Sequence, residues 1–169
     1  MLQLGLARAV AAGGEGLVVP ADVRQSTEVE RYVREANTAF GGIDILFNNA
    51  GTEGYVGPLE NTTEDDWDRV FEVNAKGVLL GMKSVLPVLR ERGGGCIVNT
   101  ASTLGLGSSP GLASYGATKH AVVGLTKTAA KMWGGDNIRV NVVALGPVDT
   151  PLFERSLPQD GGDTRTQIV

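Results

Sequence analysis

The amino-acid sequence predicts an α/β fold, a doubly wound parallel sheet with helices on both of its faces. Short apolar runs typical of strands alternate along the chain with longer segments of helical periodicity, which is the pattern of βαβ units. The runs are apolar at nearly every position, as expected for strands buried on both sides of a parallel sheet. The 169 residues contain no internal repeat and no linker, so we expect a single domain over 1–169.

Four segments are predicted strands because each is short, rich in aliphatic and β-branched residues, and bounded by turn residues. They are Gly16–Pro20, Ile43–Phe47, Gly95–Thr100 and Ile138–Val143. The only cysteine, Cys96, lies in the third of these runs, which favours a buried apolar filler over a reactive thiol and excludes an internal disulfide.

Three segments between the strands are predicted helices: Ser26–Ala39, Thr63–Arg92 and Ser114–Trp133. We expect a break near Asn74, because asparagine is unfavourable inside a helix and tends to engage nearby backbone. Four acidic residues within 64–68 follow two threonines at the start of the second helix. Helix capping and the helix dipole explain this acidic cluster, so no metal site is expected there.

Composition and charge narrow the classes of partner. The net charge of -4 and the absence of a basic stripe or aromatic ladder argue against a nucleic-acid partner. No apolar run approaches the ~20 residues that span a bilayer. The first 13 residues show helical spacing of apolar residues rather than the pattern of a signal peptide, so a cytoplasmic location is expected.

The most informative residues are Ser102, Tyr115 and Lys119. Tyr115 and Lys119 are four apart in a predicted helix, so both side chains lie on one face and the ammonium can reach the phenol. A phenol titrates near pH ~10 unaided, and a nearby positive charge favours the phenolate. We therefore expect Lys119 to make Tyr115 an acid and base near neutral pH, with the Ser102 hydroxyl holding a substrate oxygen beside it.

Other interpretations of these residues remain open at this point. Tyr-x-x-x-Lys alone also fits a surface tyrosine that packs on a lysine stem. The only histidine, His120, is adjacent to Lys119 and would point about 100 degrees away from it on a helix. A Ser-His-acid triad is therefore not supported, which argues against a hydrolase.

Three further motifs accompany this trio. Asn48 begins the string Asn-Asn-Ala-Gly directly after an apolar run, Asn74 lies in Val-Asn-Ala-Lys-Gly, and 141–150 reads Asn-Val-Val-Ala-Leu-Gly-Pro-Val-Asp-Thr. In this order and spacing the motifs resemble the short-chain dehydrogenase/reductase family, over about residues 10 to 155. Within that family the chain looks like the branch that acts on cyclic or secondary alcohols and ketones.

The resemblance implies an incomplete Rossmann-like sheet. The family opens with a strand, a Gly-rich turn, a helix and a second strand, none of which we find in this sequence, and its last strand would follow Thr150. With the family order 3-2-1-4-5-6-7, the chain would supply only strands 3 to 6, as a partial dinucleotide-binding and catalytic domain truncated at both ends. The strand at 43–47 would then have an open apolar edge, and we expect a marginal fold for a lone monomer.

The resemblance also implies residue roles. Tyr115 is expected to be the acid and base, Lys119 its partner, Ser102 the group that orients the substrate oxygen, and Asn74 the support of a proton relay. The cofactor would be NAD or NADP, with NAD slightly favoured, and no metal is needed. The implied cofactor-binding residues are Asp22, Val23, Asn49, Ala50, Gly51, Tyr115, Lys119, Gly146, Val148 and Thr150.

Two of these assignments have alternatives. Asp22 also fits an ordinary turn or cap aspartate. The family's usual Pro-Gly after the sixth strand is replaced by Leu145 and Gly146, with a proline only at 147, which puts the path of that loop in doubt.

The function expected from the resemblance is interconversion of a secondary alcohol and a ketone by hydride transfer with a nicotinamide cofactor. The substrate would be a small molecule, and the chain would form a dimer or tetramer with its own copies if it folds. The alternative is a non-catalytic remnant that binds cofactor poorly, because the phosphate-binding turn and its helix N-terminus are not found, and that acts only by association.

Overall fold

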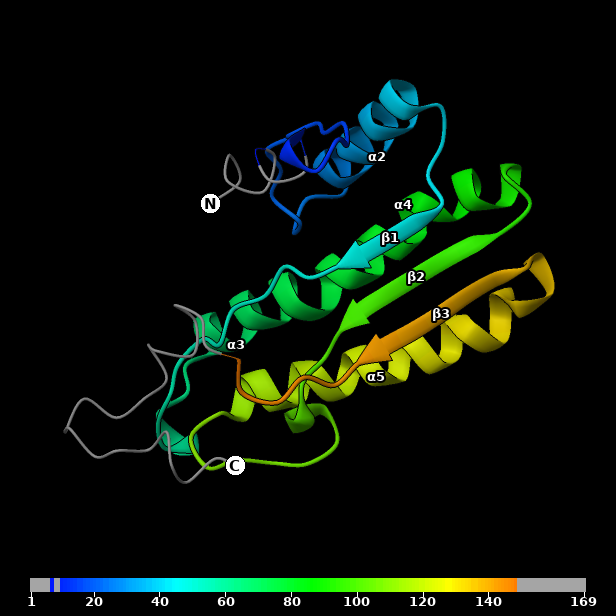
Figure 1. Ribbon diagram of the computed structural model, residues 1–169. Coiled ribbons are helices and arrows are strands. Elements are labelled where there is room, and N and C mark those ends of the chain that lie inside the picture. The colour runs from blue at the N-terminus through cyan, green and yellow to red at the C-terminus, as the bar shows by residue number, and fades with distance from the viewer. Residues whose placement is uncertain (1–6, 8–9, 149–169) are drawn as a thin grey trace.

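A computed structural model describes residue 7 and residues 10–148 of the chain. Three parallel strands form its sheet, β1 (Ile45–Asn48), β2 (Gly95–Thr100) and β3 (Ile138–Val143), in the order β1-β2-β3. Figure 1 shows all three arrows running in one direction, so their carboxyl ends meet at one edge of the sheet. The parallel sheet with helical crossovers confirms the predicted α/β class, with a Rossmann-like arrangement.

The helices lie where the sequence predicts them. α2 spans Ser26–Phe40 and ends at Gly41, which has the left-handed φ of 69 degrees that favours glycine. α3 (Glu64–Phe71) begins at the cap residue Thr63, whose side chain accepts a hydrogen bond from the Asp66 backbone N–H. Capping therefore accounts for the acidic cluster at this helix start, as the sequence predicts.

The predicted break at Asn74 is confirmed and takes the form of a π-helical turn. This turn, Glu72–Lys76, joins α3 to α4 (Gly77–Glu91). α5 (Ala113–Trp133) is the longest described helix and leads through a short 3-10 turn, Gly134–Asp136, into β3. Two more 3-10 turns lie at Leu59–Asn61 and Thr103–Gly105.

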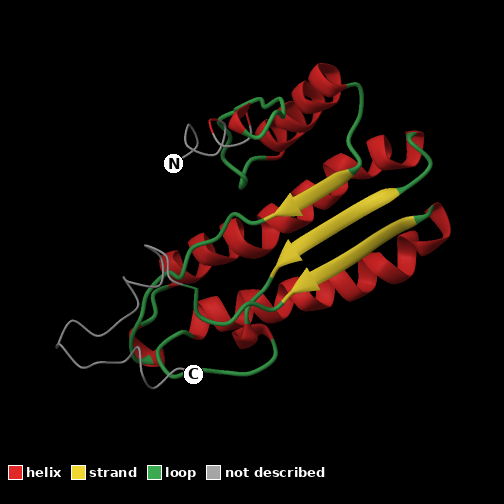
Figure 2. Cartoon of the chain, in the orientation of Figure 1, coloured by secondary structure: helices red, strands yellow, loops and turns green. Residues whose placement is uncertain are grey.

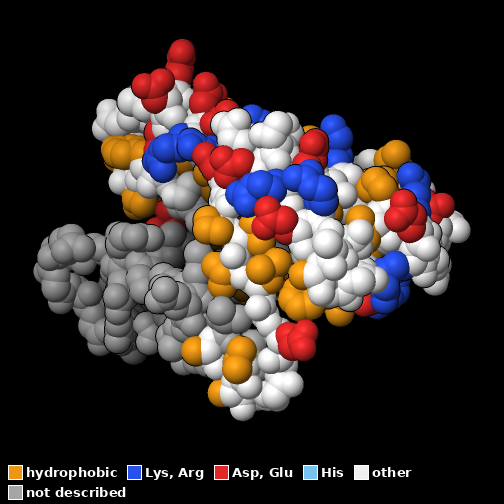
Figure 3. Space-filling view, turned by 90° about the horizontal axis from the view of Figure 1, so that it is seen from above, with side chains coloured by type: hydrophobic (Ala, Val, Ile, Leu, Met, Phe, Trp, Pro, Cys, Tyr) orange, Lys and Arg blue, Asp and Glu red, His pale blue; other side chains and the backbone are white. Residues whose placement is uncertain are grey.

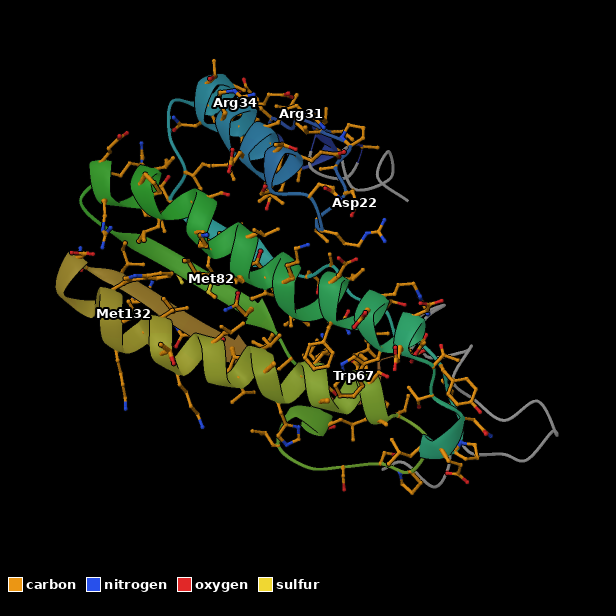
Figure 4. All side chains as sticks on the ribbon, turned by 180° about the vertical axis from the view of Figure 1, so that it is seen from behind. Asp22, Arg31, Arg34, Trp67, Met82 and Met132 are labelled. Carbon is orange, nitrogen blue, oxygen red and sulfur yellow. The ribbon has the colours of Figure 1, made fainter. Side chains whose placement is uncertain are left out.

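α4 and α5 cover one face of the sheet (Figures 1 and 2). Figure 4, seen from behind, shows both helices in front of the strands, with Met82 on α4. The core lies between these two layers. Its fully or nearly buried side chains are Val78, Met82, Val85, Leu89, Ile97, Ala101, Val122, Val123, Ala129, Ile138 and Val140.

The opposite face of the sheet is covered by none of the described helices (Figure 1), so the prediction of helices on both faces is wrong for the described residues, whose helices cover one face only. On β1, Ile45 is 66% exposed and Phe47 is 55% exposed, although both are large apolar residues. β1 is also an edge strand of the described sheet, with β2 as its paired neighbour. The open apolar edge that the sequence predicts for this strand is therefore present in the described residues.

The predicted strand at Gly16–Pro20 is wrong. Residues 14–22 form no helix or strand, and Leu17 is 47% exposed. A strand needs a neighbour to satisfy its backbone N–H and C=O groups, and the described residues supply none for this segment. The apolar run is consistent with a strand, but no partner holds it in that conformation.

A buried amide network joins the sheet to the helices. The Asn48 amide of β1 donates to Asn99 Oδ1 of β2 at 2.9 Å, and the Asn99 amide donates to Thr126 Oγ1 of α5 at 3.0 Å. A Cβ at Gly81 of α4 would collide with the Asn48 side chain, so a larger residue here would displace Asn48 where this helix crosses β1. Because Asn99 and Thr126 are almost fully buried, these bonds fix the register between layers.

Candidate active site

The candidate site lies at the carboxyl ends of the strands, the edge where open α/β sheets bind ligands. Asn49 follows β1, Ser102 follows β2 and Gly146 follows β3. The backbone N–H of Ala101 donates to Val143 O and that of Thr103 donates to Leu145 O, both at 2.9 Å. The segments that follow β2 and β3 therefore continue side by side past the end of the sheet.

Ser102 is held in a fixed place by its own turn. It caps the 3-10 turn Thr103–Gly105, where its Oγ accepts a hydrogen bond from the Leu104 N–H at 3.2 Å. Ser102 is 9% exposed. The hydroxyl therefore stands at the end of β2 with its own proton left to donate.

Lys119 is a buried lysine, only 4% exposed. Its Nζ donates to the carbonyl oxygen of Thr100 at 2.9 Å and lies 5.3 Å from the centroid of the Tyr115 ring. Burial lowers the pKa of the Lys119 ammonium to about 8, because a charge removed from water is disfavoured. An ammonium has three donors, so two remain for a ligand at this edge.

Tyr115 is half-buried in the first turn of α5. Burial raises the pKa of its phenol, a hydrogen bond with the Ser102 side chain opposes that rise, and the charge of Glu53 adds to it. The expected lowering of this pKa by Lys119 stays a prediction. The Lys119 ammonium lies over the ring and is hydrogen-bonded to the Thr100 carbonyl, and burial is the largest cause of the raised pKa of the phenol.

Asn74 is fully buried in the π-helical turn and makes three hydrogen bonds. Its Oδ1 accepts from the Thr52 N–H at 2.8 Å, and its Nδ2 donates to Thr52 O at 2.8 Å and to Thr118 Oγ1 at 3.0 Å. The side chain thus clamps the backbone of the loop after β1 and also contacts α5.

The predicted Asn49, Ala50 and Gly51 are exposed at this edge. The Thr100 hydroxyl donates to Asn49 Oδ1 at 2.9 Å, which links the ends of β1 and β2. A Cβ at Gly51 would lie 3.5 Å from Asn74 Oδ1 and 3.7 Å from Lys119 Nζ. Glycine at this position leaves the space beside the buried ammonium open.

A cleft of about 110 Å³ brings predicted residues from separate segments together. Val23 comes from the segment before α2, Asn49 and Ala50 from the end of β1, and Gly77 from the start of α4. The full lining is Val23, Tyr32, Phe47, Asn48, Asn49, Ala50, Val73, Gly77 and Val78.

Asp22 lies in the segment before α2 (Figure 4) and is tied to its own turn. Its carboxylate accepts bonds from the Arg24 backbone N–H at 3.0 Å and from the Arg24 guanidinium at 2.7 Å. The same hydrogen bonds lower the pKa of the Asp22 carboxyl to about 2. Its backbone N–H donates to Glu28 Oε2 at 2.7 Å. The turn-aspartate interpretation therefore holds, and a contact with a cofactor stays a prediction.

The loop after β3 is only partly described. Gly146 and Val148 are exposed beyond the end of the sheet, whereas Thr150 lies outside the described residues. The bond from the Thr103 N–H to Leu145 O shows that the loop begins beside the Ser102 turn, despite the absence of the usual proline.

Two residues of this site, Thr52 and Thr118, are absent from the sequence-based prediction. Both are partners of Asn74, and Thr118 is fully buried. A threonine directly before the predicted lysine is a weak signal, because threonine side chains in helices commonly bond to their own helix backbone. Only the fold shows that Asn74 lies opposite it, 44 positions earlier in the chain.

Other chemistries have little support in the described part of the chain. His120 is exposed, and its Nδ1 lies 2.9 Å from the Gly116 carbonyl of its own helix. Within residues 10–148 we find no group of three or more side chains that could hold a metal ion. None of the described helices is long and apolar enough to span a membrane. Figure 3 shows both signs of charge side by side on the face seen from above, without a uniform basic patch.

Comparison with known proteins matches residues 4–161 to the model of the short chain dehydrogenase family. A levodione reductase from Leifsonia aquatica is 43% identical over 149 residues, which are 88% of this chain and 56% of the reductase. A 2-(R)-hydroxypropyl-CoM dehydrogenase from Xanthobacter autotrophicus is 39% identical over 155 residues, which are 90% of this chain and 61% of that enzyme.

Solved structures of proteins with related sequences are also similar to this chain. The crystal structure of levodione reductase matches with a TM-score of 0.87 and 40% identity, over 94% of this chain and 61% of the other. That of NAD+-bound xylitol dehydrogenase matches with a TM-score of 0.88 and 35% identity, over 91% of this chain and 60% of the other. The chain therefore spans well under two thirds of the length of these relatives.

Proposed function

The chain belongs to the short-chain dehydrogenase family, and we propose that it carries the acid-base centre of an NAD(P)-dependent oxidoreductase that interconverts a secondary alcohol and a ketone. The observation that carries the proposal is the convergence of Ser102, Tyr115 and Lys119 at the carboxyl end of β2. The Ser102 side chain lowers the pKa of the Tyr115 phenol, and the Lys119 ammonium lies 5.3 Å from the centroid of the same ring.

In this proposal Tyr115 moves the proton. Its hydroxyl donates to the ketone oxygen in reduction and takes the proton of the alcohol in oxidation. Ser102 donates a hydrogen bond to the same substrate oxygen and so holds it within reach of the phenol. Charge that develops on the phenolate is stabilised by the ammonium of Lys119, which burial keeps away from water.

The residues present fit a dinucleotide. The buried Lys119 ammonium has two donors beyond its bond to Thr100, suited to ribose hydroxyls, and Gly51 leaves room beside it. The cleft that Val23, Asn49 and Ala50 help to line offers a partly apolar surface for a base. A bound nicotinamide cofactor supplies or accepts the hydride.

NAD is preferred over NADP in this proposal, with support from the NAD+-bound relative. A small secondary alcohol or ketone is the proposed substrate class, since levodione reductase and xylitol dehydrogenase are among the similar proteins. Association of copies through α4 and α5 is also proposed, because Leu79 is 39% exposed and Met132 is 67% exposed on these helices. A cytoplasmic location remains part of the proposal.

The test measures NADH and NADPH binding by the purified chain and turnover with a panel of secondary alcohols and ketones. Tyr115→Phe is expected to lower turnover by about 10²- to 10⁴-fold, the usual contribution of a positioned acid or base, while cofactor affinity changes little. Tyr55→Phe is the matched control, since Tyr55 is likewise half-buried and outside the trio.

Two results would contradict the proposal. Turnover retained by Tyr115→Phe would remove the tyrosine from the chemistry. A chain that neither bound NADH saturably nor turned over any substrate would support the non-catalytic alternative.

A further inference from the structure

Thr118 is a fully buried residue of α5 whose hydroxyl makes two hydrogen bonds. Its Oγ1 donates to the backbone carbonyl of Tyr115 at 2.7 Å and accepts from Asn74 Nδ2 at 3.0 Å. The first bond lies within the helix turn that carries the candidate acid and base. The second leaves that helix for the π-helical turn Glu72–Lys76.

Asn74 extends this connection to a third segment. Its amide both accepts from and donates to the backbone of Thr52, at 2.8 Å each. A continuous series of hydrogen bonds therefore runs from the loop after β1, through Asn74 and Thr118, to the backbone of Tyr115. Both side chains in the series are 0% exposed, so water does not compete for these bonds.

The start of α5 has few other side-chain attachments. Its N-cap residue, Leu112, provides no side-chain cap, and the buried Ser114 Oγ has no hydrogen-bond partner among the described residues. Besides the Thr118 hydroxyl, the side-chain interactions of this part of the helix are the Lys119 bond to Thr100 O, the effect of Ser102 on the Tyr115 phenol and the contact of the exposed His120 with Gly116 O. The orientation of Tyr115 therefore depends on a small number of tethers.

We propose that Thr118 is a positioning residue, whose hydroxyl holds the turn of Tyr115 in register with Asn74 and with the loop around Thr52. The proposal rests on the proposed function, because it assigns Thr118 a part in placing the acid and base. Thr118 itself touches no reacting atom. It acts through the backbone of Tyr115.

α5 contains a matched control for this proposal. Thr126 is also buried, donates to the Val122 carbonyl of its own helix at 2.7 Å and accepts from Asn99 Nδ2 at 3.0 Å. It thus makes the same two kinds of bond as Thr118, two turns further along the helix. If the Thr118 hydroxyl only stabilised the fold, Thr118→Val and Thr126→Val should have similar effects on the protein.

The experiment compares Thr118→Val, Thr118→Ser and Thr126→Val in the full chain. The first measurement is the titration of the Tyr115 phenol by NMR of ring-labelled tyrosine, assigned with Tyr115→Phe, which requires no turnover. We expect Thr118→Val to move this titration, because the pKa of the phenol depends on its burial and on the Ser102 side chain, and both change when the phenol is displaced. Thr118→Ser and Thr126→Val should leave the titration unchanged.

The second measurement is turnover with the cofactor held at saturation. Thr118→Val should lower kcat by about tenfold to hundredfold, the scale of an ångström-level misplacement, and change the cofactor KM less than about threefold. Thr118→Ser should restore kcat to within about threefold of the original value, because the hydroxyl is kept.

The outcomes separate the two proposals. If the unmodified chain shows no turnover, the proposed function fails, and the Tyr115 titration still decides the role of Thr118. A titration that is unchanged in Thr118→Val, or is moved equally by Thr126→Val, would overturn the positioning role.

Discussion

The two parts of α5 differ in the side chains that they bury. The first two turns, 113–120, belong to the candidate site, whereas the remainder of the helix, 121–133, packs against the sheet. The first part contains a buried lysine, a half-buried tyrosine and a buried hydroxyl that has no hydrogen-bond partner among residues 10–148. The second part buries apolar side chains, among them Val122, Val123 and Ala129, and pairs its buried threonine with Asn99. One helix therefore contains costly polar groups where the site lies and conventional packing where it supports the sheet.

The largest effect expected from this difference is on turnover. Lys119→Met removes the buried ammonium that stabilises the Tyr115 phenolate, so we expect the rate to fall by about 10²-fold or more. Lys131→Met, an exposed position in the second part of the same helix, should change the rate less than about twofold. Steady-state kinetics with NAD and a secondary alcohol provide the comparison. Equal rates in the two variants would remove Lys119 from the mechanism.

The next largest effect is on the pH dependence of the free energy of unfolding. The pKa of Lys119 in the folded chain is about 8, below its ordinary value of 10.5, so the unfolded chain binds more protons between these two pH values. The contribution of Lys119 to the free energy of unfolding therefore rises between about pH 8 and pH 10.5. The total rise is on the order of 3 kcal/mol.

The difference in unfolding free energy between the original chain and Lys119→Met isolates this contribution from the tyrosines, which ionise in the same range. Urea unfolding at pH 7, 8, 9 and 10 should show the free energy of unfolding of the original chain rising relative to that of Lys119→Met as the pH rises. A constant difference would mean that Lys119 carries an unperturbed charge.

A smaller effect is expected in the second part of the helix. Val122→Ala removes two methyl groups from a fully buried position and should lower the free energy of unfolding by about 1 to 3 kcal/mol. The Tyr115 titration should stay where it is, because the substitution lies away from the first turn. A shift in that titration would show that the two parts of α5 are coupled through packing.

The smallest effect is expected at Ser114. Ser114→Ala removes a buried hydroxyl that has no hydrogen-bond partner within the described part of the chain, so it should raise the free energy of unfolding by about 1 kcal/mol. Ser109→Ala, at an exposed position before the helix, is the control and should be neutral within about 0.5 kcal/mol. A loss of stability in Ser114→Ala would show that the hydroxyl has a partner in solution.

Much of this arrangement could be predicted from local signals. The runs at 95–100 and 138–143 are strands with the predicted bounds, and the helix at 26–40 differs by one residue. The break at Asn74 was also predictable, because its cause is the chemistry of a single side chain. Local signals could not decide whether residues 16–20 form a strand, since a strand forms only where a neighbouring strand pairs with it.

The sequence by itself determined the alternation of strands and helices and the one-turn separation of Tyr115 and Lys119, because these follow from periodicity and spacing along the chain. Only the tertiary structure decided that Thr118 lies opposite Asn74, and that burial raises the pKa of the Tyr115 phenol. The contact and the pKa both depend on which segments pack together and exclude water, and residues adjacent in sequence do not determine that packing.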